Sequence, residues 1–110
     1  MPEESEVHEG TWLQWPHHHQ YGKTYRDRLD GTWVAMTKAL QTGEKVHIIV
    51  YDETEKKRVT ALLQKSKIDL KNIDFSIIPN DDVWVRDNGP IYVRNSDGKL
   101  VIQDWGFNGW

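Results

Sequence analysis

The sequence contains no cysteine. Without cysteine there is neither a disulfide framework nor a thiolate metal site. The chain also lacks a basic excess, because 14 lysine and arginine residues stand against 17 acidic ones and leave a formal charge of −3. There is therefore no electrostatic drive toward nucleic acid.

Membrane and targeting signals are missing as well. No apolar run approaches the roughly 20 residues that a membrane-spanning helix needs. The N-terminal stretch MPEESEVHE has four glutamates and no basic residue, so it is neither a secretion signal nor a transit peptide. No glycine-rich phosphate loop is present, since DNGP and SDGK lack the required pattern. These absences favour a cytoplasmic protein with no cofactor, no membrane partner and no nucleic-acid partner.

What the chain does have is enough apolar sequence for one modest core. Its 110 residues fit one small domain, and 37% of them are hydrophobic. Six tryptophans are an unusual number for this length. Tryptophan lines ligand pockets and also simply fills cores, so the count alone leaves both open.

The first half of the chain predicts a strand, a loop and a helix. Residues 10–16 (GTWLQWP) alternate apolar and polar side chains and stop at proline, as a strand does. Residues 17–25 (HHHQYGKTY) are typical of a loop. A helix is predicted from Asp27, ended by Thr42-Gly43 with Gly43 as a left-handed cap. Helical spacing places four apolar residues on its buried face: Leu29, Trp33, Met36 and Leu40.

The next segment predicts two strands around a second helix. Residues 45–52 (KVHIIVYD) contain a nearly continuous apolar run, which indicates a strand buried on both faces and makes His47 a hydrogen-bonded core residue. Asp52 is the predicted N-cap of the next helix, and Glu55 three residues on resembles the reciprocal partner in a capping box. The helix that follows is expected to bury Val59, Leu62, Leu63 and Ser66. A third strand then places Ile73, Phe75 and Ile77 on one face and ends at Pro79.

The last part predicts a hairpin, with strands at 91–94 and 100–105 and a turn at Asp97-Gly98. Strands that alternate with helices predict an α/β layer with parallel pairs. The sequence closes on DWGFNGW, an aromatic and glycine-rich stretch unlike the polar, frayed ends of most domains. We therefore expect a truncated chain.

The stretch NDDVWVRDNGP (residues 80–90) follows the third strand, where ligands bind in open α/β sheets. One interpretation is a cation receptor, in which a carboxylate takes forked N–H bonds and Trp84 offers its ring face. The alternative is structural: Asp81 and Asp82 make Asx-turns, Arg86 pairs with Asp87, and Trp84 fills the core. The residues alone slightly favour the structural alternative, because such charged pairs often serve structure.

The run of three histidines at residues 17–19 raises a metal hypothesis. Together with Asp81 and Asp82 it could serve a metal-dependent hydrolase. Adjacent histidine side chains diverge, however, and no spaced carboxylate accompanies them. We therefore expect a solvated loop here and no metal site.

Three motifs together carry a resemblance to a known family. HEGTWLQWP (8–16), NDDVWVRDNGP (80–90) and DWGFNGW (104–110) are similar to segments of the agmatine deiminase family, which is itself similar to bacterial-type peptidylarginine deiminases. They occur in the family's order and at about its spacing. The resemblance covers residues 1–110 but only the N-terminal portion of the family's fold.

The resemblance implies a fold and a reaction. The fold class is α/β, a partial pentein (α/β propeller) of about the first one to two repeat units. The reaction is hydrolysis of a guanidino group, in which agmatine and water give N-carbamoylputrescine and ammonia, a step of polyamine metabolism. Two carboxylates would hold the guanidinium N–H groups, a cysteine thiolate would attack the carbon, and a histidine would protonate the leaving ammonia.

Some of the family's functional residues match positions here. Asp87 matches the first substrate carboxylate, as a catalytic and substrate-binding residue. Trp84 matches the aromatic beside it, and Trp110 falls where the segment that binds the substrate's tail begins. Arg86 is expected to support the loop, and Asp81 and Asp82 to shape the turn. The nucleophilic cysteine, the catalytic histidine and the second carboxylate have no match in this chain.

Two expectations follow from those missing parts. The parent would be a hydrolase of C–N bonds in linear amidines, acting on agmatine or an arginine-like substrate, whereas this chain alone should be inactive. Open strand edges should also make it self-associate, stay partly disordered or require the missing portion. The alternative function is a non-catalytic module that binds a guanidinium or another cation.

Overall fold

A computed structural model describes residue 3 and residues 5–106 of the chain. The chain divides into two compact units. The larger unit is His8–Val83, and the smaller one combines Met1–Val7 with Trp84–Trp110. The chain therefore passes from the larger unit to the smaller one at Val83–Trp84, inside the motif NDDVWVRDNGP.

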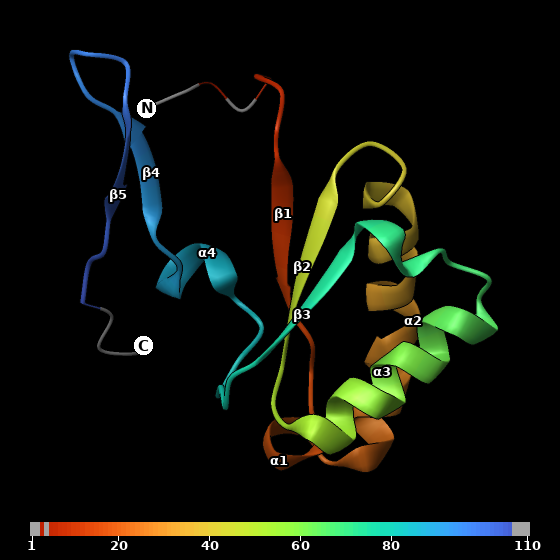
Figure 1. The fold of residues 1–110 in the computed structure, drawn as a ribbon. Coiled ribbons are helices and arrows are strands. Elements are labelled where there is room, and N and C mark those ends of the chain that lie inside the picture. Colours follow the sequence, from red (N-terminus) through yellow and green to blue (C-terminus); the bar gives the residue numbers. More distant parts are fainter. Residues whose placement is uncertain (1–2, 4, 107–110) are drawn as a thin grey trace. The chain divides into compact units, whose positions relative to one another are not determined.

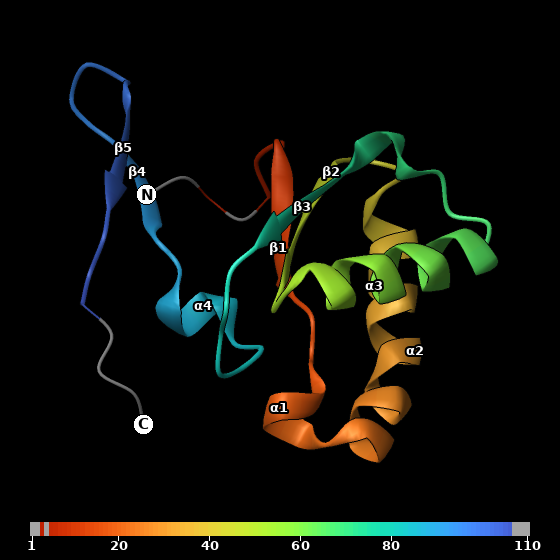
Figure 2. The same cartoon turned by 60° about the horizontal axis from the view of Figure 1, so that its bottom comes forward.

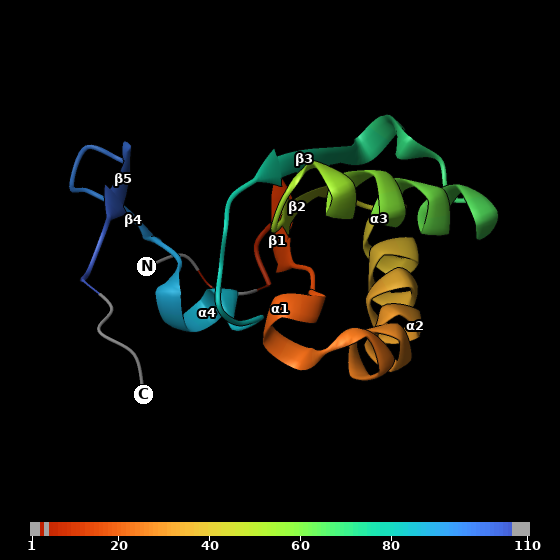
Figure 3. The ribbon, with the colours of Figure 1, turned by 90° about the horizontal axis from the view of Figure 1, so that it is seen from below.

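The larger unit is built on a parallel sheet. Its strands are β1 (Gly10–Gln14), β2 (Lys45–Val50) and β3 (Ile73–Ile77), in the order β1-β2-β3. The two long helices, α2 (Lys23–Leu40) and α3 (Glu53–Lys65), connect consecutive strands and lie on the same face of the sheet (Figure 1 and Figure 3). The predicted α/β layer with parallel pairs is confirmed.

The core lies between this sheet and its helices. From β2, Val46, Ile48 and Val50 are fully buried, and Val59 and Leu63 of α3 pack against them. Fully burying an aliphatic side chain of this size is worth about 1.5–3 kcal/mol, so this cluster is the main source of stability in the unit.

The prediction that β2 is buried on both faces is wrong. Its second face carries His47 and Ile49, which are only half-buried. The physical reason is that both covering helices lie on the other face. His47 is accordingly not a core residue: it stacks on Trp12 of β1 with 4.7 Å between ring centroids, and its Nδ1 lies 3.4 Å from Asp74 Oδ2 of β3.

The residues between β1 and α2 also differ from the prediction. The predicted loop contains a short helix, α1 (His18–Tyr21), and α2 starts at Lys23 rather than at Asp27. Gly22 separates the two helices with a φ of +72°, a conformation that glycine adopts without steric cost. Figure 2 shows this turn between α1 and α2.

The buried face and the end of α2 are only partly as expected. Trp33 and Leu40 do pack against the core, whereas Leu29 and Met36 do not belong to it. The fully buried positions are instead two polar residues, Asp30 and Thr37. The cap prediction for Gly43 is wrong: Gln41 is the C-cap in a right-handed conformation, and Gly22 and Gly98 are the glycines with positive φ among the described residues.

The predictions for α3 and β3 are largely confirmed. Asp52 Oδ1 accepts a hydrogen bond from the Glu55 amide at 2.8 Å and caps α3. Val59 and Leu63 are buried, and Leu62 and Ser66 are half-buried. After a 3-10 turn, η1 (Leu70–Asn72), Ile73, Phe75 and Ile77 share the helix-covered face of β3, where Ile77 at the strand end is 45% exposed.

The smaller unit contains a one-turn helix and the predicted hairpin. Helix α4 spans Val85–Asn88, and β4 (Ile91–Arg94) pairs antiparallel with β5 (Leu100–Gln103). Gly98 turns the hairpin with a φ of +77°. β5 ends at Gln103, two residues before the predicted end. The structure of the described residues establishes a small α/β arrangement, and the propeller remains a prediction.

Candidate functional site

Trp84 and Asp87 lie in a single helical turn of the smaller unit. Trp84 is the N-cap of α4, and its carbonyl accepts a hydrogen bond from the Asp87 amide at 3.0 Å. This bond joins the two residues through the backbone of one turn. Trp84 is 57% exposed and Asp87 is exposed too, so the interpretation of Trp84 as a core residue is wrong.

Gly89 ends this turn, and its backbone lies very close to the Val85 carbonyl oxygen. Its amide donates to the Val85 carbonyl at 2.7 Å, and a Cβ at this position would lie 2.5 Å from the same oxygen. A methyl group cannot be accommodated there without moving the backbone. Pro90 follows, and the residue before a proline is pushed toward an extended conformation, as Gly89 shows with φ −85° and ψ 162°. The sequence N-G-P therefore stops α4 after one turn.

This arrangement can bind a planar cation. The Asp87 carboxylate offers two oxygens to a pair of N–H donors, and the indole ring of Trp84 offers its negative face. Both groups are accessible. Trp110, the third predicted contact, lies outside the described residues, and the expected supporting role of Arg86 stays a prediction.

The first part of the same motif, residues 80–83, belongs to the larger unit, and side chains from elsewhere in that unit form hydrogen bonds to it. Asp82 Oδ1 accepts hydrogen bonds from its neighbour's amide, Val83 N–H, at 2.8 Å and from the Tyr21 hydroxyl at 2.7 Å. The Gln14 side-chain amide donates to the Asp82 carbonyl. Asp82 is therefore hydrogen-bonded within this loop, and the expectation that Asp81 and Asp82 shape a turn stays a prediction.

His17 holds the loop one step earlier. Its Nε2 lies 2.6 Å from the Asn80 carbonyl, which can only accept, so Nε2 carries the proton. The side chain is 3% exposed, and its ring contacts Tyr51 with 4.4 Å between centroids. The prediction of a solvated histidine loop is therefore wrong for the backbone, which is helical from His18, and for His17, which is a buried structural donor. His19 is exposed, as expected.

The surroundings of Tyr21 shift the pKa of its hydroxyl. Burial, together with the hydrogen bond and the negative charge of Asp82, raises the pKa of the Tyr21 hydroxyl to about 12. Both causes disfavour the phenolate, because it would be poorly solvated and would face a carboxylate. Tyr21 therefore stays a hydrogen-bond donor over the whole physiological pH range.

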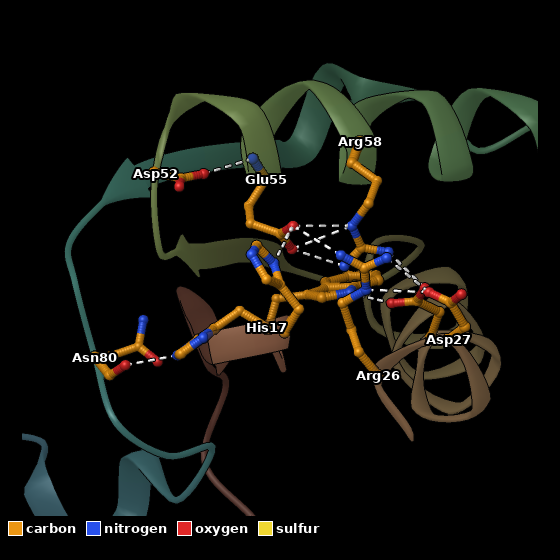
Figure 4. Close-up of polar contacts among 10 residues, drawn as sticks. His17, Arg26, Asp27, Asp52, Glu55, Arg58 and Asn80 are labelled. Carbon is orange, nitrogen blue, oxygen red and sulfur yellow. Dashed lines mark hydrogen bonds and ion pairs between the residues drawn. The ribbon is translucent and has the colours of Figure 1, made fainter. Parts of the chain in front are cut away.

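A second polar cluster lies between α2 and α3. Glu55, 2% exposed, accepts from Arg26 Nη1 at 3.2 Å and from Arg58 Nη2 at 2.7 Å, as Figure 4 shows. Arg58 Nη1 also donates to Asp30 at 2.5 Å, and Asp30 accepts from Trp15 Nε1 at 2.9 Å. Burial alone would lower the pKa of Arg58, but its bonds to Glu55 and Asp30 raise it. The hydrogen-bond donors named here all come from the larger unit, so we infer that this cluster holds α2 and α3 together.

A metal-binding arrangement is not found in the part of the chain that the structure describes: it holds no group of three or more His, Asp or Glu side chains placed to bind an ion. Of the residues in the metal hypothesis, His17 is bound to Asn80 and Asp82 to Tyr21. Nor does any helix within residue 3 and residues 5–106 have the length and apolar character to cross a membrane.

Comparison with known proteins decides the family. Residues 1–110 match the family described as Porphyromonas-type peptidyl-arginine deiminase. The chain belongs to this family. Among curated relatives, the agmatine deiminase of Pseudomonas aeruginosa (strain LESB58) is 33% identical over 114 aligned residues, and that of Stutzerimonas stutzeri (strain A1501) is 32% identical over 113.

Solved structures of an agmatine deiminase agree with the fold. The agmatine deiminase of C. jejuni matches with a TM-score of 0.78 and 26% identity, over 98% of this chain and 31% of that one. A cysteine-to-serine variant of the same enzyme with substrate bound matches with a TM-score of 0.81 over 100% of this chain and 30% of that one. The chain spans about 28% of the length of the two curated relatives named above. It is similar to an N-terminal portion of these agmatine deiminases.

Proposed function

We propose that this chain supplies part of the guanidinium-binding site of an agmatine deiminase-like hydrolase. Support comes from one observation above all: in a member of the peptidyl-arginine deiminase family, an exposed carboxylate and an exposed indole, Asp87 and Trp84, occupy one helical turn. The carboxylate takes paired N–H donors of the substrate, and the ring covers the cation's face.

The reaction of the complete site requires groups that this chain lacks. A thiolate attacks the guanidinium carbon, ammonia leaves with a proton from a histidine, and water cleaves the resulting amidino–thioether to give the ureido product and free thiolate. The thiolate cannot come from these 110 residues, since they contain no cysteine. Asp87 and Trp84 orient the substrate and offset its positive charge. Holding the guanidinium group in a reactive geometry lowers the barrier to attack by the thiolate.

The substrate class is a guanidino compound. Agmatine is favoured over peptidyl- or free arginine because the two curated relatives named above are agmatine deiminases. Trp110 is the candidate contact to the substrate's aliphatic tail. No metal and no organic cofactor is required by this mechanism, because the nucleophile is a side chain and the leaving group is a protonated amine.

The first test uses the purified chain in an ammonia-release assay with agmatine, followed by calorimetric titration with agmatine. We expect no release above background and weak binding that Asp87→Asn abolishes. Asp97→Asn, a neutralised carboxylate in the hairpin turn, is the matched control and should bind as the parent does. Ammonia production by the pure chain, or unchanged binding in Asp87→Asn, would overturn the assignment.

A second candidate function is a binding module without chemistry. It is favoured by the same exposed pair together with the absence of cysteine. Tight agmatine binding by the chain on its own, lost in Asp87→Asn, would support this module over a part that needs the rest of the enzyme.

A further inference from the structure

The loop that precedes Trp84 is held by one short stretch of sequence far away in the chain. Gln14, His17 and Tyr21 come from the end of β1, the N-cap of α1 and the last residue of α1. Their partners all lie at residues 80–82, between 61 and 68 positions later. Figures 2 and 3 agree that the segment after β3 runs beside α1.

Two of the three contacts would hold a loop of almost any sequence. The Gln14 amide and the His17 ring donate to the backbone carbonyls of Asp82 and Asn80. Both donors are nearly inaccessible, with 4% and 3% of their surface exposed. A buried donor that loses its acceptor incurs the full desolvation cost of a polar group, so these bonds strongly favour the observed path of the loop.

The third contact depends on one side chain. The Asp82 carboxylate receives both the Tyr21 hydroxyl and the Val83 amide on the same oxygen. Val83 is the last residue of the larger unit, and Trp84 follows it directly. The contact from α1 therefore reaches, through one carboxylate, the peptide that leads into the Trp84–Asp87 turn.

We infer that Gln14, His17 and Tyr21 are positioning residues, which fix the path of residues 80–83, the segment that leads into the turn carrying Trp84 and Asp87. They touch no substrate themselves. An effect of these residues on agmatine binding rests on the proposed function. Their hydrogen bonds to residues 80–82 are a separate property of the chain that can be measured without a ligand.

The test compares two hydroxyl deletions by residue-resolved amide exchange. Tyr21→Phe keeps the ring and its contact with Tyr25, whose centroid is 5.8 Å away, and removes only the bond to Asp82. Tyr25→Phe is the control, because within residue 3 and residues 5–106 the Tyr25 hydroxyl has no hydrogen bond. We expect exchange of the Val83 and Asp87 amides to accelerate at least about fivefold in Tyr21→Phe and not in Tyr25→Phe.

A conservative pair of variants separates positioning from general stability. Asp82→Asn keeps an oxygen that can accept from both Tyr21 and Val83, whereas Asp82→Ala keeps none. We expect parent-like exchange in Asp82→Asn and the accelerated pattern in Asp82→Ala, with core amides such as Ile48 unchanged in both. Uniform acceleration that includes Ile48, or acceleration at Val83 that does not reach Asp87, would overturn the inference.

An agmatine titration of the same proteins links the inference to function. The dissociation constant should rise at least about threefold in Tyr21→Phe and in Asp82→Ala, and stay at the parent value in Tyr25→Phe and Asp82→Asn. An unchanged constant in Tyr21→Phe would contradict a positioning role. If the parent does not bind agmatine, the proposed function fails, and the exchange pattern still decides whether the anchoring exists.

Discussion

Replacing Arg58 by methionine should destabilise the larger unit strongly. Among the residues that the structure describes, Arg58 is the one side chain that bonds both buried carboxylates of the helix interface, Glu55 at 2.7 Å and Asp30 at 2.5 Å. Methionine keeps most of the length and apolar contact of the side chain but leaves two acidic groups with one donor fewer. Removing one partner of a buried ion pair typically costs about 3–5 kcal/mol.

The lower end of that range applies here. Arg26 still donates to Glu55 at 3.2 Å, Trp15 still donates to Asp30 at 2.9 Å, and the Arg58 side chain is 21% exposed. We therefore expect a loss of about 3 kcal/mol, which for a domain of this size lowers the unfolding midpoint by roughly 12–24 °C. Such a loss is a large part of the stability of a small domain.

The assay is urea unfolding followed by far-ultraviolet circular dichroism at low protein concentration. Lys57→Met is the control, since Lys57 is the preceding residue of the same helix and is exposed. It should change the free energy of unfolding by less than about 0.5 kcal/mol. A loss below about 1 kcal/mol in Arg58→Met would refute the reasoning, because the two carboxylates would then be satisfied without this arginine.

Three further predictions follow from single features. Burial and Asp82 raise the pKa of Tyr21 from 10.0 to about 12, so the unfolded chain loses the hydroxyl proton more easily than the folded chain does. The contribution of this proton to the free energy of unfolding is complete below pH 10 and is lost as the pH rises toward 12. Solvent screening at this partly exposed group reduces it to about 1 kcal/mol, and Tyr21→Phe should flatten that part of an alkaline unfolding profile. Gly89→Ala should disrupt α4, since the new Cβ would lie 2.5 Å from the Val85 carbonyl, and should weaken agmatine binding while leaving the core amides of the larger unit protected. The hairpin exposes Ile91, Leu100 and Ile102, so light scattering of the pure chain should show self-association that Leu100→Lys and Ile102→Lys reduce, whereas a monodisperse monomer would count against it.

The sheet and the hairpin could be predicted from the sequence because the signals for them are local. Alternation in β1, the apolar run of β2 and the turn at Gly98 each lie within a few residues, and the same holds for the cap that Asp52 provides to α3. The one-sided covering of β2 and the early end of β5 at Gln103 were not predicted. An apolar run indicates burial, but which faces are covered depends on where the helices pack.

The site was only partly readable for the same reason. Trp84 and Asp87 are three residues apart in a distinctive motif, so their pairing could be predicted. The side chains that hold the loop could not, because Gln14, His17 and Tyr21 meet partners more than 60 residues away and HHQY shows no helical periodicity. Glu55 misled in a similar way: its spacing from Asp52 suggested a reciprocal cap, but its carboxylate pairs with Arg26 and Arg58.

The most direct test of the guanidinium-binding proposal joins residues 1–110 to the remainder of the Pseudomonas aeruginosa agmatine deiminase, in place of that enzyme's matching segment. Ammonia release from agmatine is then measured for the chimera and for its Asp87→Asn variant. The account predicts turnover by the chimera and a loss of at least about a hundredfold in kcat/KM on Asp87→Asn, with Asp97→Asn fully active. A folded chimera whose activity is the same with Asp87 or Asn at this position would contradict it.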